Sequence, residues 1–346
     1  MTSDGEPRDT EVFSERQRVA LRRWVAYAPR AGGKRPGDFW SRYGMPVAFL
    51  LIVVAFTSQS DAFLTLSNSQ NIVRQSAVIA IAAIGVSALF ISGGIDISQG
   101  PIIAFSGLAT ITLINLGVTD YIVIPIAVGM GAAFGAINAF FAERVKIPAL
   151  IATLGTALVI RGSAFLWTGG RSIALDRDAG AFLKWLGRGL LLFIPAPFLV
   201  TLLVAAAVAT ALRFTVWGRH TYAIGGNQEA ARTVGINIER RRTTVYILAG
   251  SLSALAGVVL AGRLASAAPN AATGAEFDII TASVLGGVSI FGGEGRVWRV
   301  LLAAILLASL SNGLVQLNVP GFWVRIVTGI VFLAALSLDR LQSNRS

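Results

Sequence analysis

The sequence contains no cysteine and a single histidine, His220. Without thiols the chain forms neither disulfides nor a thiolate metal site, and one imidazole cannot build a metal cluster. We therefore expect no metal centre. An intramembrane enzyme needs a nucleophile with a base, or a metal set such as His-Glu-x-x-His on a helix, and the sequence supplies neither.

Lysine is almost as scarce. The lysines are Lys34, Lys146 and Lys184, and none of them closes a Gly-x-x-x-x-Gly-Lys-Ser/Thr loop, the sequence that cradles nucleotide phosphates. The chain is therefore not expected to hydrolyse ATP by itself, and we expect it to bind no cofactor of its own.

Apolar residues, in contrast, are abundant: 54% of the 346 residues are hydrophobic, 14% are charged, and the mean hydropathy is +0.69. Soluble domains are more polar than this. Many apolar runs are long enough to cross a hydrocarbon core of about 30 Å as helices. The sequence thus predicts an all-α polytopic membrane protein with about ten transmembrane helices, at residues 46–58, 72–92, 97–116, 121–142, 147–167, 190–212, 244–262, 277–291, 297–314 and 322–338.

The formal net charge is +11, with a pI near 11.1. Most of the arginines and lysines fall in segments on one side of this topology, as the positive-inside rule describes, so the charge indicates orientation and not a nucleic-acid partner. Both termini are then cytoplasmic. The predicted division is a cytoplasmic tail 1–45, a transmembrane domain 46–338 with a cytoplasmic loop 213–242, and a cytoplasmic tail 339–346.

A secondary transporter would share this composition. Ion-coupled carriers usually hold carboxylates or histidines inside the membrane as relays, whereas the acidic residues here lie in tails, loops and span edges. This distribution counts against proton coupling, and an ion-coupled carrier of a small polar solute stays the alternative. The acidic residues in question are Asp61, Asp96, Asp120, Glu143, Glu276, Asp278 and Glu294.

The loop 213–242 is the one long polar insertion on the predicted cytoplasmic side. Asn227 is a good helix cap after Gly225 and Gly226, Glu229 complements the positive end of a first turn, and Gly235 suits the left-handed position that ends a helix. We predict a short helix over 228–234. Because so short a helix is marginal in water by itself, it is expected to dock against something.

Two glycine-rich turns on the same side look alike. The first contains Gly93 and Gly94, with Asp96 and Ser98 available to cap the following helix. The simple role of Asp96 is this cap, and the functional alternative is a gating role or contact with a partner. The second turn contains Gly286, Gly287, Gly292 and Gly293.

These stretches resemble the permeases of ATP-binding-cassette importers of the ribose and xylose type. Glu229-Ala230-Ala231, followed after three residues by Gly235, is similar to the start of the family's EAA motif. The stretch 91–98 is similar to the family's Thr-Gly-Gly-Ile-Asp-Leu-Ser segment, and the Leu285-Gly286-Gly287 stretch and 222–227 also match, so the resemblance covers about 71–338. The Leu-Pro that ends the EAA motif in many other importers is absent, which points to the sugar branch.

The resemblance implies a function and partners. It implies a bacterial inner-membrane permease, forming a homodimer, that imports a ribose- or xylose-like monosaccharide delivered by a periplasmic or lipid-anchored binding protein. The loop that contains Gly225, Gly226, Asn227, Glu229, Ala230, Ala231 and Gly235 would be the coupling helix, which sits in a groove of a separate ATPase. ATP and Mg²⁺ would be used by that ATPase. The particular sugar is left open.

Further residues are weaker candidates. Neutral polar side chains in or near spans suit a hydroxyl-rich solute, although helix packing explains them equally: Asn115, Asn138, Thr153, Thr156, Ser283 and Asn312. A basic outer segment can receive acidic residues of the binding protein or can be a solvated loop: Arg171, Arg177, Lys184 and Arg188. Charges within or at the edge of spans are Arg74, Arg161 and Arg325.

Overall fold

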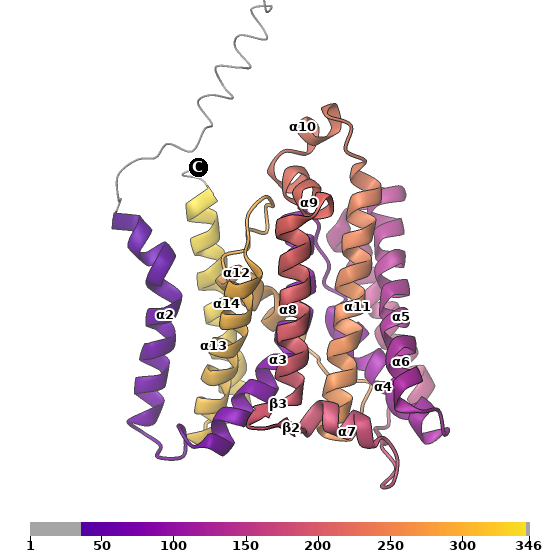
Figure 1. The fold of residues 1–346 in the computed structure, drawn as a ribbon, viewed down its shortest axis with the longest axis vertical. Coiled ribbons are helices and arrows are strands. Elements are labelled where there is room, and N and C mark those ends of the chain that lie inside the picture. Colours follow the sequence, from indigo (N-terminus) through magenta and orange to yellow (C-terminus); the bar gives the residue numbers. More distant parts are fainter. Residues whose placement is uncertain (1–35, 344–346) are drawn as a thin grey trace, which may run out of the picture. The chain divides into compact units, whose positions relative to one another are not determined.

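The structure is a computed structural model, and it describes residues 36–343, which are mainly helical (Figure 1). Residues 1–35 and 344–346 of the predicted tails lie outside this part. The chain divides into two compact units, Met1–Gly44 and Met45–Ser346, with the boundary inside α2. The helices are α2 Pro36–Thr57, α3 Leu66–Ile91, α4 Gln99–Asn115, α5 Asp120–Ala139 with the π-helical turn η1 Phe140–Arg144, α6 Ala149–Thr168, α7 Ala181–Arg188, α8 Ala196–Phe214, α9 Val216–Gly226, α10 Gln228–Thr233, α11 Ile238–Leu264, α12 Ala275–Leu285, α13 Val297–Gln316 and α14 Gly321–Ser343.

Each of the ten predicted spans coincides with a helix, and the all-α polytopic architecture is confirmed. In the described part of the chain, six helices are long and apolar enough to cross a membrane: α3, α5 with η1, α6, α8, α11 and α13. Helix α4 has 17 residues and α12 has 11, or about 26 Å and 17 Å at about 1.5 Å per residue, against a core of about 30 Å. The count of ten spans and the side of the termini therefore stay predictions.

Several predicted boundaries differ from the helices. The span 97–116 includes the end of an extended segment, 92–98, that precedes α4, and the span 277–291 runs past the end of α12. The span 190–212 begins with an antiparallel pair of two-residue strands, β2 Leu190–Leu191 and β3 Ile194–Pro195. Helices α2 and α11 begin before their predicted spans. The predicted spans cover only the apolar residues, whereas each helix also includes polar residues that precede them.

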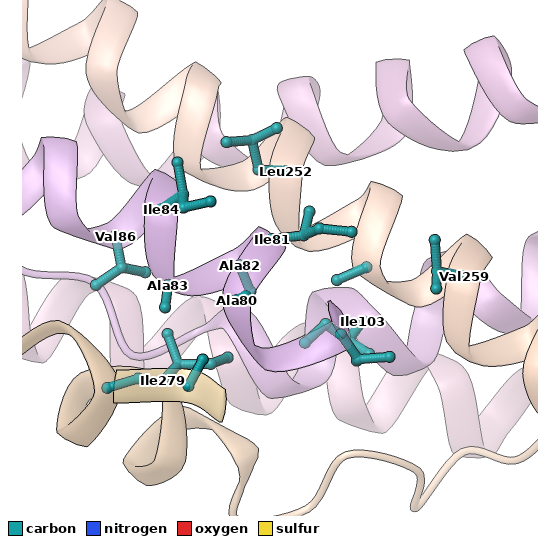
Figure 2. Close-up of a cluster of buried hydrophobic side chains, with 14 of the residues drawn as sticks. Ala80, Ile81, Ala82, Ala83, Ile84, Val86, Ile103, Leu252, Val259 and Ile279 are labelled. Atoms are coloured by element: carbon teal, nitrogen blue, oxygen red, sulfur yellow. The ribbon is translucent and has the colours of Figure 1, made fainter. Parts of the chain in front are cut away.

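Helices α3 and α11 form the centre of the second unit. In their most apolar stretches 78% and 72% of the residues are buried, against 28% in α6 and in α8. Figure 2 shows the contact: Ile81 and Ile84 of α3 lie near Leu252 of α11, with Ile103 of α4 and Ile279 of α12 alongside. The outer helices therefore expose apolar side chains to lipid. Because lipid tails are themselves apolar, burying these side chains brings no hydrophobic gain.

Helices α5 and α11 are in backbone contact, as the small residues on their faces predict. A Cβ added to Gly131 would overlap the carbonyl oxygen of Gly250, and a Cβ on Gly250 would overlap that of Gly131. Such close approach gives van der Waals packing that larger side chains would prevent.

Helices α4 and α12 each follow a non-helical segment. Carbonyl oxygens of these segments accept hydrogen bonds from side chains of other helices. Before α4, the Tyr246 hydroxyl donates to Ile95 O at 3.0 Å. Before α12, Arg161 of α6 donates through Nη1 to Pro269 O at 2.6 Å and to Ala271 O at 2.8 Å. Non-helical backbone inside a membrane protein is tolerated where other parts of the protein supply its hydrogen-bond partners. Arg161 is such a partner for the two carbonyl groups before α12. The second segment also contains β4 Ser266–Ala267, paired with β1 Ile173–Ala174.

Candidate functional site

Three glycine-containing stretches that are far apart in the sequence meet at the C-terminal end of α3. The carbonyl oxygen of Ile91 accepts a hydrogen bond from the amide of Gly293 at 3.0 Å. Gly225 of α9 lies so close to the same carbonyl that a Cβ on it would overlap the oxygen. A Cβ on Gly292 would lie 2.8 Å from the Cα of Gly225. We call the contact of Ile91, Gly225, Gly292 and Gly293 the glycine junction.

Helices α3, α12 and α10 end in the same local structure. After α3, Gly93 adopts a φ of +73° and the amide of Gly94 bonds to Leu89 O at 3.0 Å, which is a Schellman motif. Gly287 after α12 and Gly235 after α10 have φ of +77° and +82°. The left-handed position expected at Gly235 is confirmed. Because α10 ends in this way too, the likeness of the turns at Gly93 and Gly287 reflects a common helix end.

Tyr222 of α9 forms a hydrogen bond to the loop that contains Gly292 and Gly293. Its hydroxyl donates to Gly295 O at 2.9 Å. Burial raises the pKa of the Tyr222 phenol, against a smaller lowering by Arg296. The hydroxyl therefore stays protonated near neutral pH and keeps its role as a donor.

The predicted short helix is confirmed as α10, one residue shorter than expected. Asn227 is its N-cap, with Oδ1 accepting from the amide of Ala230 at 2.9 Å. Ala231 is buried and packs with Ile224 of α9 and Ile238 of α11. The exposed side chains surround an open surface hollow of about 580 Å³ and belong to Gln228, Glu229, Arg232 and Thr233. In Figure 1, α9 and α10 lie at one end of the second unit and α7 at the other.

Arg242, near the start of α11, contacts three further elements. Its Nε donates to Ser92 O at 3.0 Å, at the end of α3, and its Nη2 donates to Gln228 Oε1 of α10 at 3.1 Å. Its Nη1 lies 3.7 Å from Glu143 Oε1 of η1. The sequence prediction did not single out Arg242, because its charge was counted only as part of the basic cytoplasmic side.

Asp96 and Ser98 lie in the extended segment before α4 and are both buried. Asp96 Oδ1 accepts from the amide of Ser98 at 2.8 Å and from its hydroxyl at 2.7 Å. Asn138 of α5 donates its side-chain amide to Asp96 Oδ2 at 3.0 Å and to Ser98 Oγ at 2.8 Å. The hydroxyl of Thr156 on α6 donates to Asn138 Oδ1. This buried network joins the extended segment to α5 and α6.

The network corrects two expectations. Ser98 is the N-cap residue of α4, but its side chain makes no capping hydrogen bond because the hydroxyl is bonded to Asp96. Asp96 is only 1% exposed, so it cannot form a surface contact with a partner protein in this conformation. Its contacts are those of a group that positions the extended backbone.

The neutral polar residues proposed for a solute path are distributed over separate contacts. Each of them bonds to another helix or loop of the chain, and the structure does not bring all of them together. A role in translocation stays a prediction. The bonds join Thr153 to Ile97, Asn138 to Asp96, Ser283 to Ser87, Asn312 to Asn68 and Asn115 to Ala174.

The basic residues of the predicted outer segment lie on and next to α7, an amphipathic helix that the sequence prediction missed. Arg171, Arg177 and Arg188 are exposed. Lys184 Nζ donates to Arg177 O at 2.6 Å, and Arg188 Nε donates to Arg263 O at 2.5 Å. Their role as a docking surface stays a prediction. Among residues 36–343, no group of three or more His, Cys, Asp or Glu side chains is placed to hold a metal ion.

The fold defines the class of protein. Apolar helices long enough to cross a membrane, with a short polar helix exposed at one end, are the architecture of an α-helical polytopic membrane protein. Residues 68–336 match the family described as the branched-chain amino acid transport system permease component. The chain belongs to this family and is a multi-pass protein of the bacterial inner membrane.

Curated relatives cover nearly the whole chain. The ribose import permease protein RbsC of Escherichia coli K12 is 36% identical over 295 residues, which is 85% of this chain and 92% of that protein. RbsC of Bacillus subtilis 168 is 38% identical over 303 residues, covering 87% and 94%. The L-arabinose transport system permease protein AraH of Escherichia coli K12 is 33% identical over 309 residues, covering 88% and 92%. No solved structure matches the chain.

Proposed function

We propose that the chain is the membrane permease of an ATP-binding-cassette importer that translocates a monosaccharide. The observation that carries the proposal is the near full-length similarity to permeases named for ribose and for L-arabinose. The family description names branched-chain amino acids, but each of these similar relatives is named for a pentose. A pentose or a related monosaccharide is therefore the proposed solute.

In this proposal α10 is the contact with a separate ATPase. Its buried Ala231 and its capped N-terminus hold it on the molecule, while Glu229, Arg232 and Thr233 face outward and are available to a partner. A helix of six residues has too few hydrogen bonds to persist alone, so its docking on α9 and α11 matters for its presentation. ATP and Mg²⁺ are used by the ATPase, since the chain has no phosphate-binding loop.

The orientation follows from the same assignment. The end of the molecule with α9, α10 and the start of α11 is cytoplasmic, which agrees with its arginines at 213, 219, 232 and 240–242. With ten spans both termini are cytoplasmic too. The opposite end, with α7, then faces a sugar-binding protein, and two copies of the chain form the pathway as a homodimer.

The experiment is transport by the chain reconstituted in proteoliposomes with its ATPase and binding protein, with ATP enclosed. We expect uptake of labelled ribose, arabinose or xylose that needs both partners and hydrolysable ATP. Leucine and isoleucine serve as the comparison solutes. Uptake of these amino acids in place of sugars would refute the solute class, and uptake that follows a proton gradient without ATP would refute the importer in favour of an ion-coupled carrier.

A further inference from the structure

One guanidinium group joins four elements at the α10 end of the molecule. Arg242 projects from α11 and reaches the last carbonyl of the α3 helix end at Ser92, the side chain of Gln228 on α10 and the carboxylate of Glu143 on η1. Within the part of the chain that the structure describes, the contact with Glu143 is the sole ion pair. Each of the three guanidinium nitrogens of Arg242 contacts a different element.

The surroundings favour a firm contact. The side chains of Arg242 and Glu143 are only 14% and 12% exposed, so water and salt screen the pair less than they screen surface pairs. A Cβ on Gly93 would lie 3.2 Å from Nη2 of Arg242, which means that the guanidinium lies directly against this glycine. A hollow of about 360 Å³ borders the group and is also lined by Glu143 and Gln228.

The chemistry requires arginine at this position. A guanidinium is planar, always charged and has five N–H donors in a fixed fork, so one side chain can hold a carbonyl, an amide oxygen and a carboxylate in three directions. A lysine ammonium in the same place is a point charge on a flexible stem and cannot keep this geometry. Among residues 36–343, the neighbouring Arg241 side chain has its one hydrogen bond to the ring of His220, at 3.4 Å, so it provides a matched control.

We propose that Arg242 transmits the displacement of α10 to the ends of α3 and α5, and so links the ATPase to the transmembrane helices. This inference rests on the proposed function, in which the ATPase moves α10. Because α10 is held by only a few side chains, it moves relative to α3 and η1 unless a bond prevents it. The Arg242 contacts make these ends move together, and η1 is a π-helical turn, a type of turn often found at functional sites.

The first test compares R242Q and R242K with R241Q in proteoliposomes that contain the ATPase and the binding protein. For R242Q we expect ATP hydrolysis and co-purification of the ATPase within twofold of the wild type, and at least a tenfold fall in sugar transported per ATP. R242K keeps the charge but not the geometry and is expected to be nearly as impaired. R241Q is expected to transport like the wild type.

The second test measures the movement directly. The chain has no cysteine, so spin labels can be attached without background at two exposed positions, Arg144→Cys in η1 and Val234→Cys at the C-cap of α10. In the otherwise native chain we expect the distance between the labels to stay constant between the nucleotide-free and the ATP-vanadate-trapped complex. With R242Q added, we expect the distance to change on trapping and its distribution to broaden.

The outcomes separate the two levels of the proposal. If the wild-type complex shows no ATP-driven sugar uptake, both the proposed function and this inference are refuted. If the wild type transports and R242Q keeps the same ratio of sugar to ATP, the inference alone is refuted. Loss of ATPase binding by folded R242Q, or a label distance that changes on trapping even with Arg242 present, would also refute transmission.

Discussion

Replacing Gly225 by alanine is the most direct test of the glycine junction. The new Cβ would overlap the carbonyl oxygen of Ile91 and would lie 2.5 Å from the amide nitrogen of Gly293. The hydrogen bond between these two groups, 3.0 Å long, then has to open. Overpacking costs about 1–3 kcal/mol and the lost hydrogen bond about 0.5–1.5 kcal/mol, so we expect a total destabilisation of roughly 2–4 kcal/mol.

The adjacent Gly226 supplies the matched control. A Cβ at this position meets nothing within 4 Å, and the residue is in the last turn of α9. Gly226→Ala is therefore expected to stay within about 0.5 kcal/mol of the wild type, as surface substitutions usually do. Reversible unfolding of both variants in mixed detergent micelles, followed by circular dichroism, measures the difference. Equal stabilities of Gly225→Ala and Gly226→Ala would refute the close packing of α9 on α3.

Three more predictions concern separate contacts. Asn138→Leu removes the amide that donates to buried Asp96 Oδ2 and Ser98 Oγ and is expected to destabilise the protein by about 1–3 kcal/mol in the same unfolding assay, whereas a change below about 0.5 kcal/mol would contradict the network. Arg161→Gln frees the carbonyls of Pro269 and Ala271, so hydrogen exchange in residues 265–274 should rise at least tenfold, with exposed Arg171→Gln as the unchanged control. Asn227→Ala removes the cap of α10, which costs about 1 kcal/mol, and should weaken ATPase binding in pull-downs; binding as tight as that of the wild type would argue against α10 as the contact.

Much of the fold follows from the sequence because the apolar runs identify a helix in each predicted span. Helix α10 was also predictable, since Asn227 and Gly235 mark its two ends by the chemistry of capping. Helix α9 was missed because its buried face is formed by Gly218, Thr221 and Ile224, which give no apolar run. Helix α7 has Leu183 and Leu186 at helical spacing, but this signal covers only one short stretch of the loop 168–189 between two predicted spans.

The candidate site was predictable in its parts but not in its assembly. The glycine stretches near 93, 225 and 292 each stand out in the sequence, yet nothing local indicates that they touch one another. Arg242 carries no motif at all, because its partners at Ser92, Glu143 and Gln228 come from three distant places in the chain. Burial likewise changed the interpretation of Asp96 from a helix cap at a turn to part of an internal network.

The two attachments at this end of the molecule differ in kind, and that difference supports a division of roles. Helix α9 is joined to α3 by backbone contacts at Gly225 and Ile91, which have no side-chain freedom, so these two elements move as one body. Helix α10 follows after the single residue Asn227 and buries only Ala231. Its side-chain connection to α3 and η1 is Arg242, which bonds to Ser92 and Gln228 and lies against Glu143. A partner that pushes α10 therefore acts on η1 through Arg242 and on α3 through both Arg242 and α9, whereas a change in the glycine junction would act through stability.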